Sequence, residues 1–260
     1  LSPPSRPKPF IPLLGEETLF QRTVRRVLDG SSGLGLGVAD IAVVTAAPYA
    51  ELVRAQAPGV TVLAEPVGRN TAAAIALATV ALERDDDEVM VVLPADQTIE
   101  REAEFRATLG AAAQAARDGV AGVRSPLVTL GITPDRPATE YGYLLPRLER
   151  ADLVAGVRTF PLQAFQEKPS PDRAAELVAM PGVAWNAGIF LWRRAAIREA
   201  LAAFAPEVLE PIAAAVAAGP GALESTYPAV RSISIDYAVM EPAAAEGRVA
   251  MGAMEVGWSD

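Results

Sequence analysis

The sequence predicts an α/β fold in which helices cover a Rossmann-like, doubly wound sheet that is mixed but mostly parallel. Apolar segments of strand length alternate with longer helical segments through the first half of the chain, which is typical of βαβ units. Residues 89–93 (VMVVL) form an unbroken apolar run, as expected for a strand buried on both faces. Pro94 follows and cannot extend a central strand, so it marks the strand's carboxyl end.

The composition limits the chemistry. With 260 residues the chain can form one large domain or two small ones, and although 51% of it is apolar, no run approaches the roughly 20 residues that span a bilayer. The absence of cysteine and histidine excludes thiol nucleophiles and imidazole ligands, so any metal must be held by oxygen, as Mg²⁺, Mn²⁺ and Ca²⁺ are. A net charge of −9 argues against a nucleic-acid surface but allows a small phosphorylated substrate.

The elements of the first half follow one another at βαβ spacing. Residues 16–28 predict an amphipathic helix, because Leu19, Phe20, Val24 and Leu28 fall on one face. Residues 30–37, rich in glycine, predict a loop. The remaining expected elements of this half are strands over 41–44 and 60–63 and helices over 48–56, 72–84 and 102–117.

From residue 127 the alternation is less regular. The expected strands cover 127–131, 141–145, 160–166 and 249–251, and the expected helices cover 171–178, 194–204 and 206–218. Residues 184–192 predict a loop that runs into a strand. Since no repeat and no flexible linker interrupts the sequence, we expect a single domain over residues 1–260, with residues 1–126 and 127–260 as its two halves.

Four polar clusters stand at the ends of the predicted strands: residues 65–71, the pair Asp96–Gln97, the pair Glu167–Lys168, and residues 186–188. Ligands of open α/β sheets bind outside the carboxyl ends of the strands, so four such clusters indicate a shared cleft. Taken alone, Asp96 fits a cap of the next turn better, and Glu167 with Lys168 fits a solvated ion pair better.

Two basic residues, Arg69 and Lys8, have local surroundings that would suit the binding of a negatively charged ligand. Arg69 lies at a predicted helix start, where backbone N–H groups and the helix dipole suit a phosphate or a polar nucleotide group. The alternative is a simple capped helix, with Asn70 or Thr71 as the cap. Lys8 stands between two prolines that would aim its ammonium group, although a lysine near a terminus is usually just solvated.

Together the motifs resemble one family over essentially the whole chain: the sugar-1-phosphate nucleotidyltransferases, and within it the mannose-1-phosphate guanylyltransferase (GDP-mannose pyrophosphorylase) branch. R-P-K-P-F is similar to the end of the family's signature loop, E-P-V-G-R-N-T-A to its nucleotide segment and L-P-A-D-Q to its metal-binding turn. G-I-T-P-D-R-P-A-T-E-Y-G-Y, E-K-P and W-N-A-G resemble its sugar-binding segments, and G-W-S-D its second metal motif. S-I-D-Y-A-V-M-E is characteristic of the mannose/guanine branch.

The resemblance implies the nucleotide-diphospho-sugar transferase fold, with a nucleotide-binding half (1–126) and a sugar-binding half (127–260). The implied reaction transfers GMP from GTP to mannose-1-phosphate and releases pyrophosphate, with Mg²⁺ (or Mn²⁺) as cofactor. Lys8 and Asp96 take catalytic roles, and Asp96 and Asp260 hold the metal. The implied substrate contacts are Glu65, Arg69, Asn70, Thr71, Gly142, Glu167, Lys168, Asn186 and Gly188. The resemblance further implies a cytoplasmic enzyme, compatible with a homodimer, that binds neither nucleic acid nor membrane.

The sequence departs from the family at several points. Gln97 stands where the family usually has histidine, the loop at Ser5–Arg6 is a few residues short, and the G-G-x-G-x-R motif with the strand before it is absent. We therefore expect a fragment truncated at both ends, without the fold's first strand and inactive by itself. Two alternatives stay open: a glucose-1-phosphate thymidylyl- or uridylyltransferase, and a non-catalytic nucleotide-sugar-binding regulatory subunit.

Overall fold

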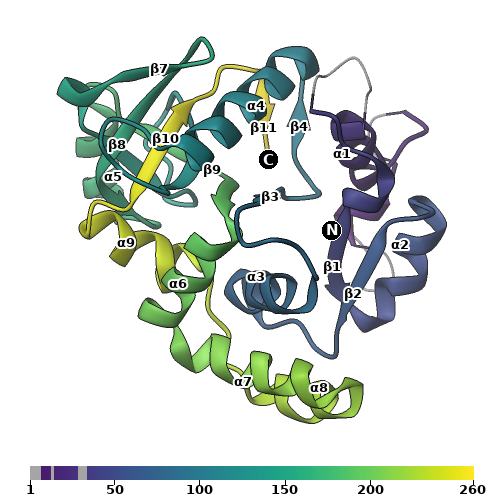
Figure 1. Ribbon diagram of the computed structural model, residues 1–260. Helices are drawn as coiled ribbons and strands as arrows, with labels where there is room; N and C mark the ends of the chain where they lie inside the picture. The colour runs from purple at the N-terminus through teal and green to yellow at the C-terminus, as the bar shows by residue number, and fades with distance from the viewer. Residues whose placement is uncertain (1–6, 13–14, 29–33) are drawn as a thin grey trace.

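The computed structural model describes residues 7–12, 15–28 and 34–260 (Figure 1). The Ser5–Arg6 junction and residues 30–33 of the predicted loop lie outside this range. The helices are α1 Leu19–Leu28, α2 Ala50–Gln56, α3 Asn70–Ala81, α4 Glu102–Asp118, α5 Pro171–Val178, α6 Arg194–Phe204, α7 Pro206–Ala218, α8 Pro220–Thr226 and α9 Glu241–Ala245. The strands are β1 Ala42–Ala46, β2 Thr61–Glu65, β3 Val89–Val92, β4 Thr98–Ile99, β5 Leu127–Ile132, β6 Tyr143–Pro146, β7 Asp152–Val154, β8 Val157–Gln166, β9 Ala184–Arg193, β10 Val249–Ala253 and β11 Trp258–Ser259.

The main sheet has seven strands, in the order β10-β5-β9-β6-β8-β7, with β3 pairing β9. Only β10–β5 is a parallel pair in this sheet, because β8 and β9 run opposite to their neighbours. The pairings nevertheless give β3, β5, β6, β7 and β10 one common direction, so most strands of the sheet run the same way. The predicted mixed α/β fold class is confirmed.

The strand over residues 89–93 is less enclosed than its sequence predicts. Within the described residues β3 pairs with β9 alone, and β1 pairs with β2 in a separate two-stranded parallel sheet. Val91 of β3 is 38% exposed, so the prediction of a strand buried on both faces is wrong. The edge of β3 away from β9 has no strand partner among these residues.

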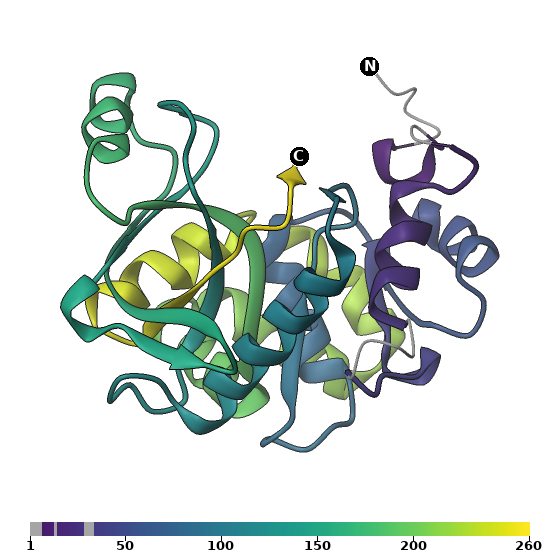
Figure 2. The same ribbon diagram turned by 90° about the horizontal axis from the view of Figure 1, so that it is seen from above.

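Helices cover both faces of the main sheet (Figure 2), and the alternation of side chains along β9 shows why. Phe190 and Trp192 belong to the core that includes α3, α6 and α7, whereas Ile189 and Leu191 belong to the core beneath α4. The alanine-rich α3 is buried on several sides, as expected for a helix without a polar face.

Several element boundaries differ from the prediction for local reasons. The first helix begins at Leu19 and not at residue 16, because Thr18 and Gln21 form a capping box: the Gln21 N–H donates to Thr18 Oγ1 (3.2 Å) and the Thr18 N–H to Gln21 Oε1 (3.0 Å). Residues 184–192 are all strand, within β9. The short strands β4, β7 and β11 escaped prediction, since two or three residues carry too little periodicity.

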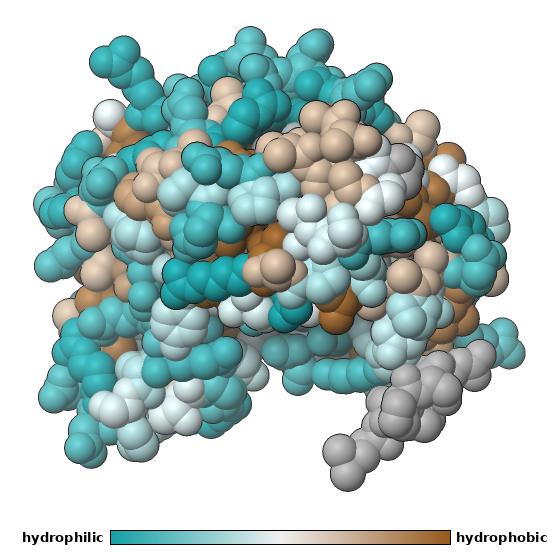
Figure 3. All heavy atoms as spheres, turned by 90° about the horizontal axis from the view of Figure 1, so that it is seen from below, coloured by the Kyte–Doolittle hydropathy of each residue, from teal (hydrophilic) through white to brown (hydrophobic). Residues whose placement is uncertain are grey.

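The surface seen from below is mixed: its apolar side chains form small areas separated by polar ones (Figure 3). Among the residues that the structure describes, no single helix is both long and apolar enough to cross a bilayer. Helices α6 and α7 pass that test of length and composition only as a pair, and they meet at a bend of 119°.

Candidate functional site

The chain's last residues lie against the turn that follows β3. Strands β4 and β11 pair antiparallel, with Thr98 opposite Ser259, so Asp260 lies beside the turn that carries Asp96. The pKa of the Asp260 carboxyl is raised, first by burial and then by the negative charge of Asp96, while the Lys8 ammonium opposes the rise. Three groups that are far apart in sequence therefore act on one another: two carboxylates and one cation.

Gln97 fastens this turn to the neighbouring strand. Its side chain is buried, and Nε2 donates to the Ala187 carbonyl at 2.7 Å. Gly188 lies next to Pro94. Its backbone φ of +69° is a conformation that residues with a side chain rarely adopt, and it brings the segment W-N-A-G close to the turn after β3. The turn carrying Asp96 and the segment W-N-A-G are thus held as one unit.

The two carboxylates fit the implied divalent cation. Mg²⁺ is typically bound through one or two carboxylates, with substrate phosphates and water as its other ligands. The described residues contain no cluster of three or more histidine, cysteine or acidic side chains that would form a complete protein cage. Asp96 and Asp260 carry like charges close enough to raise the pKa of Asp260, and a cation between them would relieve that repulsion.

Asn186 is the centre of a second cluster. Its Oδ1 accepts hydrogen bonds from the Thr129 hydroxyl (2.7 Å) and the Gly188 N–H (3.2 Å). Its Nδ2 donates to Asp236 Oδ1 at 2.9 Å, and its backbone N–H donates to the Gly142 carbonyl at 2.8 Å. Asn186 comes to this edge because it lies near the amino end of β9, which runs opposite to β3 and β5, and not because it follows a strand.

Glu167 lies next to this cluster with only 8% of its side chain exposed. Its N–H donates to Glu241 Oε1 (2.7 Å), and its carboxylate pairs with Lys168 Nζ at 3.4 Å. Burial, reinforced by the charge of Asp236, raises the pKa of Glu167 to about 7, although the Lys168 ammonium opposes the rise. The solvated ion pair considered above is therefore wrong for Glu167, while the Lys168 side chain is 54% exposed.

Gly142 leaves room for Glu167 to pack against the chain. A Cβ at residue 142 would lie 2.5 Å from Glu167 Oε2 and 3.1 Å from the ring of Phe165, so the Glu167 carboxylate would have to shift and the ring to move slightly. Lys168, with φ +45°, donates its N–H to the Tyr141 carbonyl at 3.3 Å. The segments Y-G-Y and E-K-P thus fix one another.

The nucleotide segment is held by residues 227–235. The Tyr227 hydroxyl donates to Glu65 Oε1 at 2.6 Å, and Arg69 Nη2 donates to the Pro228 carbonyl. Glu65 is 8% exposed, and burial raises its pKa. Because its carboxyl group faces into the protein, Glu65 fits a role in holding the loop better than the predicted contact with the nucleotide.

The start of α3 also differs from the prediction. The residue before the helix is Arg69, so neither Asn70 nor Thr71 is its cap residue, although Asn70 Oδ1 accepts the Thr71 N–H at 2.8 Å. The Ala72 N–H donates to the Ile233 carbonyl at 3.2 Å. Two N–H groups of this helix start are thus already used within the protein, which weakens the case for a phosphate there.

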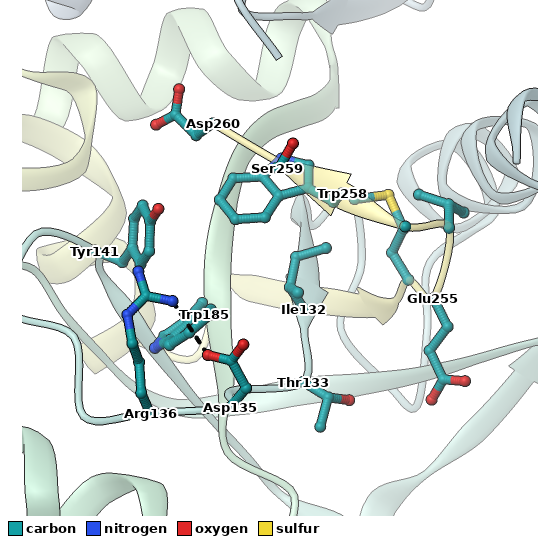
Figure 4. A pocket seen from close by; sticks show the side chains of 13 residues that line it. Ile132, Thr133, Asp135, Arg136, Tyr141, Trp185, Glu255, Trp258, Ser259 and Asp260 are labelled. Atoms are coloured by element: carbon teal, nitrogen blue, oxygen red, sulfur yellow. Dashed lines mark hydrogen bonds and ion pairs between the residues drawn. The ribbon is translucent and has the colours of Figure 1, made fainter. Parts of the chain in front are cut away.

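A cleft of about 460 Å³ opens beside Asp260, between the loop that follows β5 and the last residues of the chain (Figure 4). Tyr141 forms its wall with two tryptophans, at ring centroid distances of 5.1 Å to Trp185 and 5.5 Å to Trp258. The Arg136 guanidinium lies over Tyr141 and Trp185, at 5.9 and 5.1 Å from the ring centroids. The cleft places Asp260 at the border of an aromatic wall.

The predicted residues thus fall into three groups. The first group consists of Lys8, Asp96 and Asp260, whose charges act on one another. The second consists of Gly142, Glu167, Lys168, Asn186 and Gly188. The third consists of Glu65, Arg69, Asn70 and Thr71. Sequence reasoning missed Thr129, Tyr227, Asp236 and Glu241 as site residues. The signal for two of them was present, since Asp236 and Glu241 are the acidic residues of S-I-D-Y-A-V-M-E.

Comparison with known proteins identifies the family. A family profile described as nucleotidyl transferase matches residues 4–260. The chain belongs to the nucleotidyl transferase family. The structure of this nucleotidyl transferase is similar to that of a protein described as mannose-1-phosphate geranyltransferase from Thermus thermophilus, with a TM-score of 0.82 and 32% identity over 100% of this chain and 70% of that one. It is also similar to a structure described as mannose-6-phosphate isomerase from Helicobacter pylori, with a TM-score of 0.78 and 25% identity over 98% and 95% of the two chains.

Curated relatives of this nucleotidyl transferase carry related names. The mannose-1-phosphate guanylyltransferase of Sinorhizobium fredii (strain NBRC 101917 / NGR234) is 38% identical over 274 residues, which cover 100% of this chain and 50% of the relative. The alginate biosynthesis protein AlgA of Pseudomonas aeruginosa is 35% identical over 270 residues, covering 100% and 53%. The chain therefore spans about half the length of these relatives.

Proposed function

We propose that this nucleotidyl transferase transfers GMP from GTP to mannose-1-phosphate, giving GDP-mannose and pyrophosphate. The observation that carries the proposal is the convergence of Asp96, Asp260 and Lys8 next to the turn that Gln97 ties to W-N-A-G. Two carboxylates and a cation suit the transfer of a charged phosphoryl group, and Asn186 with Glu167 suits a polyhydroxylated acceptor. The names of the relatives point to the same pair of substrates.

In this reaction an oxygen of the sugar phosphate attacks the α-phosphorus of GTP in line with the departing pyrophosphate. Because the attacking oxygen is already an anion, no side chain has to remove a proton, in keeping with a chain that has no histidine. The protein's contribution is positioning and charge neutralisation. A divalent cation supplies charge neutralisation at the phosphates, and Asp96 and Asp260 would hold it.

The remaining residues bind and orient the substrates. Lys8, exposed on its short helical turn Lys8–Phe10, would stabilise negative charge on the transferring group. Asn186, Glu167 and the Lys168 ammonium would take the hexose and its phosphate, around the backbone of Gly142 and Gly188. Arg69, Asn70 and Thr71 would meet the nucleotide, on a loop that Glu65 and Tyr227 hold in place.

Residues 1–126 would thus form the nucleotide-binding half and residues 127–260 the sugar-binding half of one catalytic domain. A cytoplasmic location, a homodimer, and the absence of nucleic-acid and membrane partners remain predictions from the resemblance. The alternative substrates are glucose-1-phosphate as acceptor and dTTP or UTP as nucleotide donor. The chain also resembles a UDP-glucose pyrophosphorylase structure, at 14% identity and a TM-score of 0.58, but this likeness shows the fold alone and does not support the alternative.

The test is a substrate panel with the full-length protein. Pyrophosphate release is measured with GTP, ATP, UTP and dTTP, each with mannose-1-phosphate and with glucose-1-phosphate, in Mg²⁺. We expect GTP with mannose-1-phosphate to be the preferred pair, because a site that hydrogen-bonds one base edge leaves buried groups unpaired with another base. Equal rates with UTP and glucose-1-phosphate would move the protein to the other branch, and no turnover of any pair would favour a regulatory subunit.

A further inference from the structure

The side-chain amide of Asn186 is held in one orientation by three partners. The Gly188 N–H can only donate, so it fixes the side of the amide that carries Oδ1. The Thr129 hydroxyl, itself fully buried, lies against the same oxygen at 2.7 Å. Asp236 Oδ1 lies 2.9 Å from Nδ2, and a carboxylate there accepts that N–H. A flipped amide would face donor with donor at Gly188 and acceptor with acceptor at Asp236.

This arrangement decides what Asn186 can offer to a substrate. Its Oδ1 accepts from the Gly188 N–H, and it is the nearer of the two acceptors of the single Thr129 hydroxyl hydrogen, the other being the Ile189 carbonyl at 3.1 Å. Nδ2 has two hydrogens and gives one of them to Asp236. The second N–H has no hydrogen-bond partner among the residues that the structure describes, so it is left to be donated. Asn186 therefore presents a donor and not an acceptor, which suits a hydroxyl or phosphate oxygen.

The helical turn that carries Asp236, a π-helix over Asp236–Met240, also reaches the nucleotide segment through the residues just before it. Two hydrogen bonds connect them: the Ile235 N–H donates to the side-chain Oγ1 of Thr71 at 2.8 Å, and the Ala72 N–H donates to the Ile233 carbonyl. The same turn lies close to Glu167, whose carboxyl feels the charge of Asp236. Asp236 is thus fixed from the nucleotide side while it holds a residue on the sugar side.

We propose that Asp236 is a positioning residue for the sugar phosphate: it holds the Asn186 amide so that the free N–H faces an acceptor oxygen of that substrate. The inference rests on the proposed function and goes beyond it, because it assigns a role to a carboxylate outside the metal pair. What matters in this role is the acceptor oxygen at residue 236 and not its charge. An asparagine there can still accept from Asn186, whereas an alanine cannot.

The experiment is a double-mutant cycle in the full-length protein, with the KM values for mannose-1-phosphate and GTP as readouts. We expect Asp236→Ala to raise the KM for mannose-1-phosphate about tenfold, as for the loss of one buried hydrogen bond, with the KM for GTP changed less than about threefold. Asp236→Asn is expected to restore most of the affinity. In an Asn186→Ala background, Asp236→Ala should add little, because its effect acts through Asn186.

Two further variants complete the design. Thr129→Val removes the hydroxyl on the other side of the amide; it is expected to raise the same KM by a smaller factor that again disappears in the Asn186→Ala background, and it serves if Asp236→Ala does not fold. Asp118→Ala, an exposed residue at the end of α4, is the matched control and should leave both KM values unchanged.

The outcomes separate the two proposals. If the wild type turns over GTP and mannose-1-phosphate but Asp236→Ala leaves the KM unchanged, or its effect adds fully to that of Asn186→Ala, the positioning role is refuted while the proposed function stands. If Asp236→Asn is as impaired as Asp236→Ala, charge and not acceptor geometry matters, and the inference is likewise wrong. If the wild type does not use mannose-1-phosphate, both proposals fall.

Discussion

Glu167 should make the stability of the protein depend on pH in an unusual direction. Its carboxyl is buried beside Asp236, with Lys168 as its cationic partner, and its pKa rises from 4.5 to about 7. The folded state therefore binds the proton more tightly than the unfolded state. Stability is highest when the group is protonated in both states, and it is lost as the pH rises from about 4.5 through 7.

The size of the effect follows from these two values. A difference of one pKa unit corresponds to 1.36 kcal/mol, so the full change is about 3 kcal/mol, most of which falls between pH 5 and pH 8. Glu167→Gln keeps the shape of the protonated side chain and cannot ionise. We expect the variant to exceed the wild type in free energy of unfolding by a margin that grows by about 2–3 kcal/mol from pH 5 to pH 8.

The assay is urea unfolding of both proteins at pH 5, 6, 7 and 8, followed by circular dichroism. Glu176→Gln, an exposed residue of α5, is the control and should follow the wild type at every pH within a few tenths of a kcal/mol. A constant difference between Glu167→Gln and the wild type from pH 5 to 8 would refute the reasoning, since it would mean that Glu167 ionises normally in the folded protein.

Two other predictions each rest on one contact of the site. Gly142→Ala, whose Cβ would lie 2.5 Å from Glu167 Oε2, should lower kcat/KM for mannose-1-phosphate at least about tenfold with little change in the KM for GTP; equal losses for both substrates would count against it. Tyr227→Phe removes the hydroxyl that donates to the buried Glu65 at 2.6 Å, and it should lower the free energy of unfolding, measured with urea, by roughly 1–3 kcal/mol. An unfolding midpoint equal to that of the wild type would contradict this prediction.

The sequence predicted long elements with a clear pattern well. Helices α5, α6 and α7 have the predicted bounds, because proline at each of two helix starts and continuous apolar faces mark them locally. The environment of β3 was not predictable in this way. A run such as VMVVL specifies an apolar strand, but whether a neighbour covers Val91 depends on which other strands are present.

The site shows the same division between local and long-range information. Asp96, Glu167 and Asn186 could be predicted as candidate site residues because each belongs to a short motif. The roles of Glu65 and Asp236 depend on partners far along the chain: Tyr227 for Glu65, and Asn186 for Asp236. A buried carboxyl with a phenol partner and an exposed one that meets a substrate look alike in sequence, so only the fold distinguishes them.

The most direct test of the central claim is the turnover of Asp96→Asn and Asp260→Asn in the full-length protein at saturating Mg²⁺, GTP and mannose-1-phosphate. The two carboxylates are proposed to hold the cation that neutralises the transferring phosphate. Each substitution should therefore leave the circular dichroism spectrum unchanged and lower kcat at least about a hundredfold. Near-normal kcat for either folded variant would contradict the assignment of that carboxylate to the reaction.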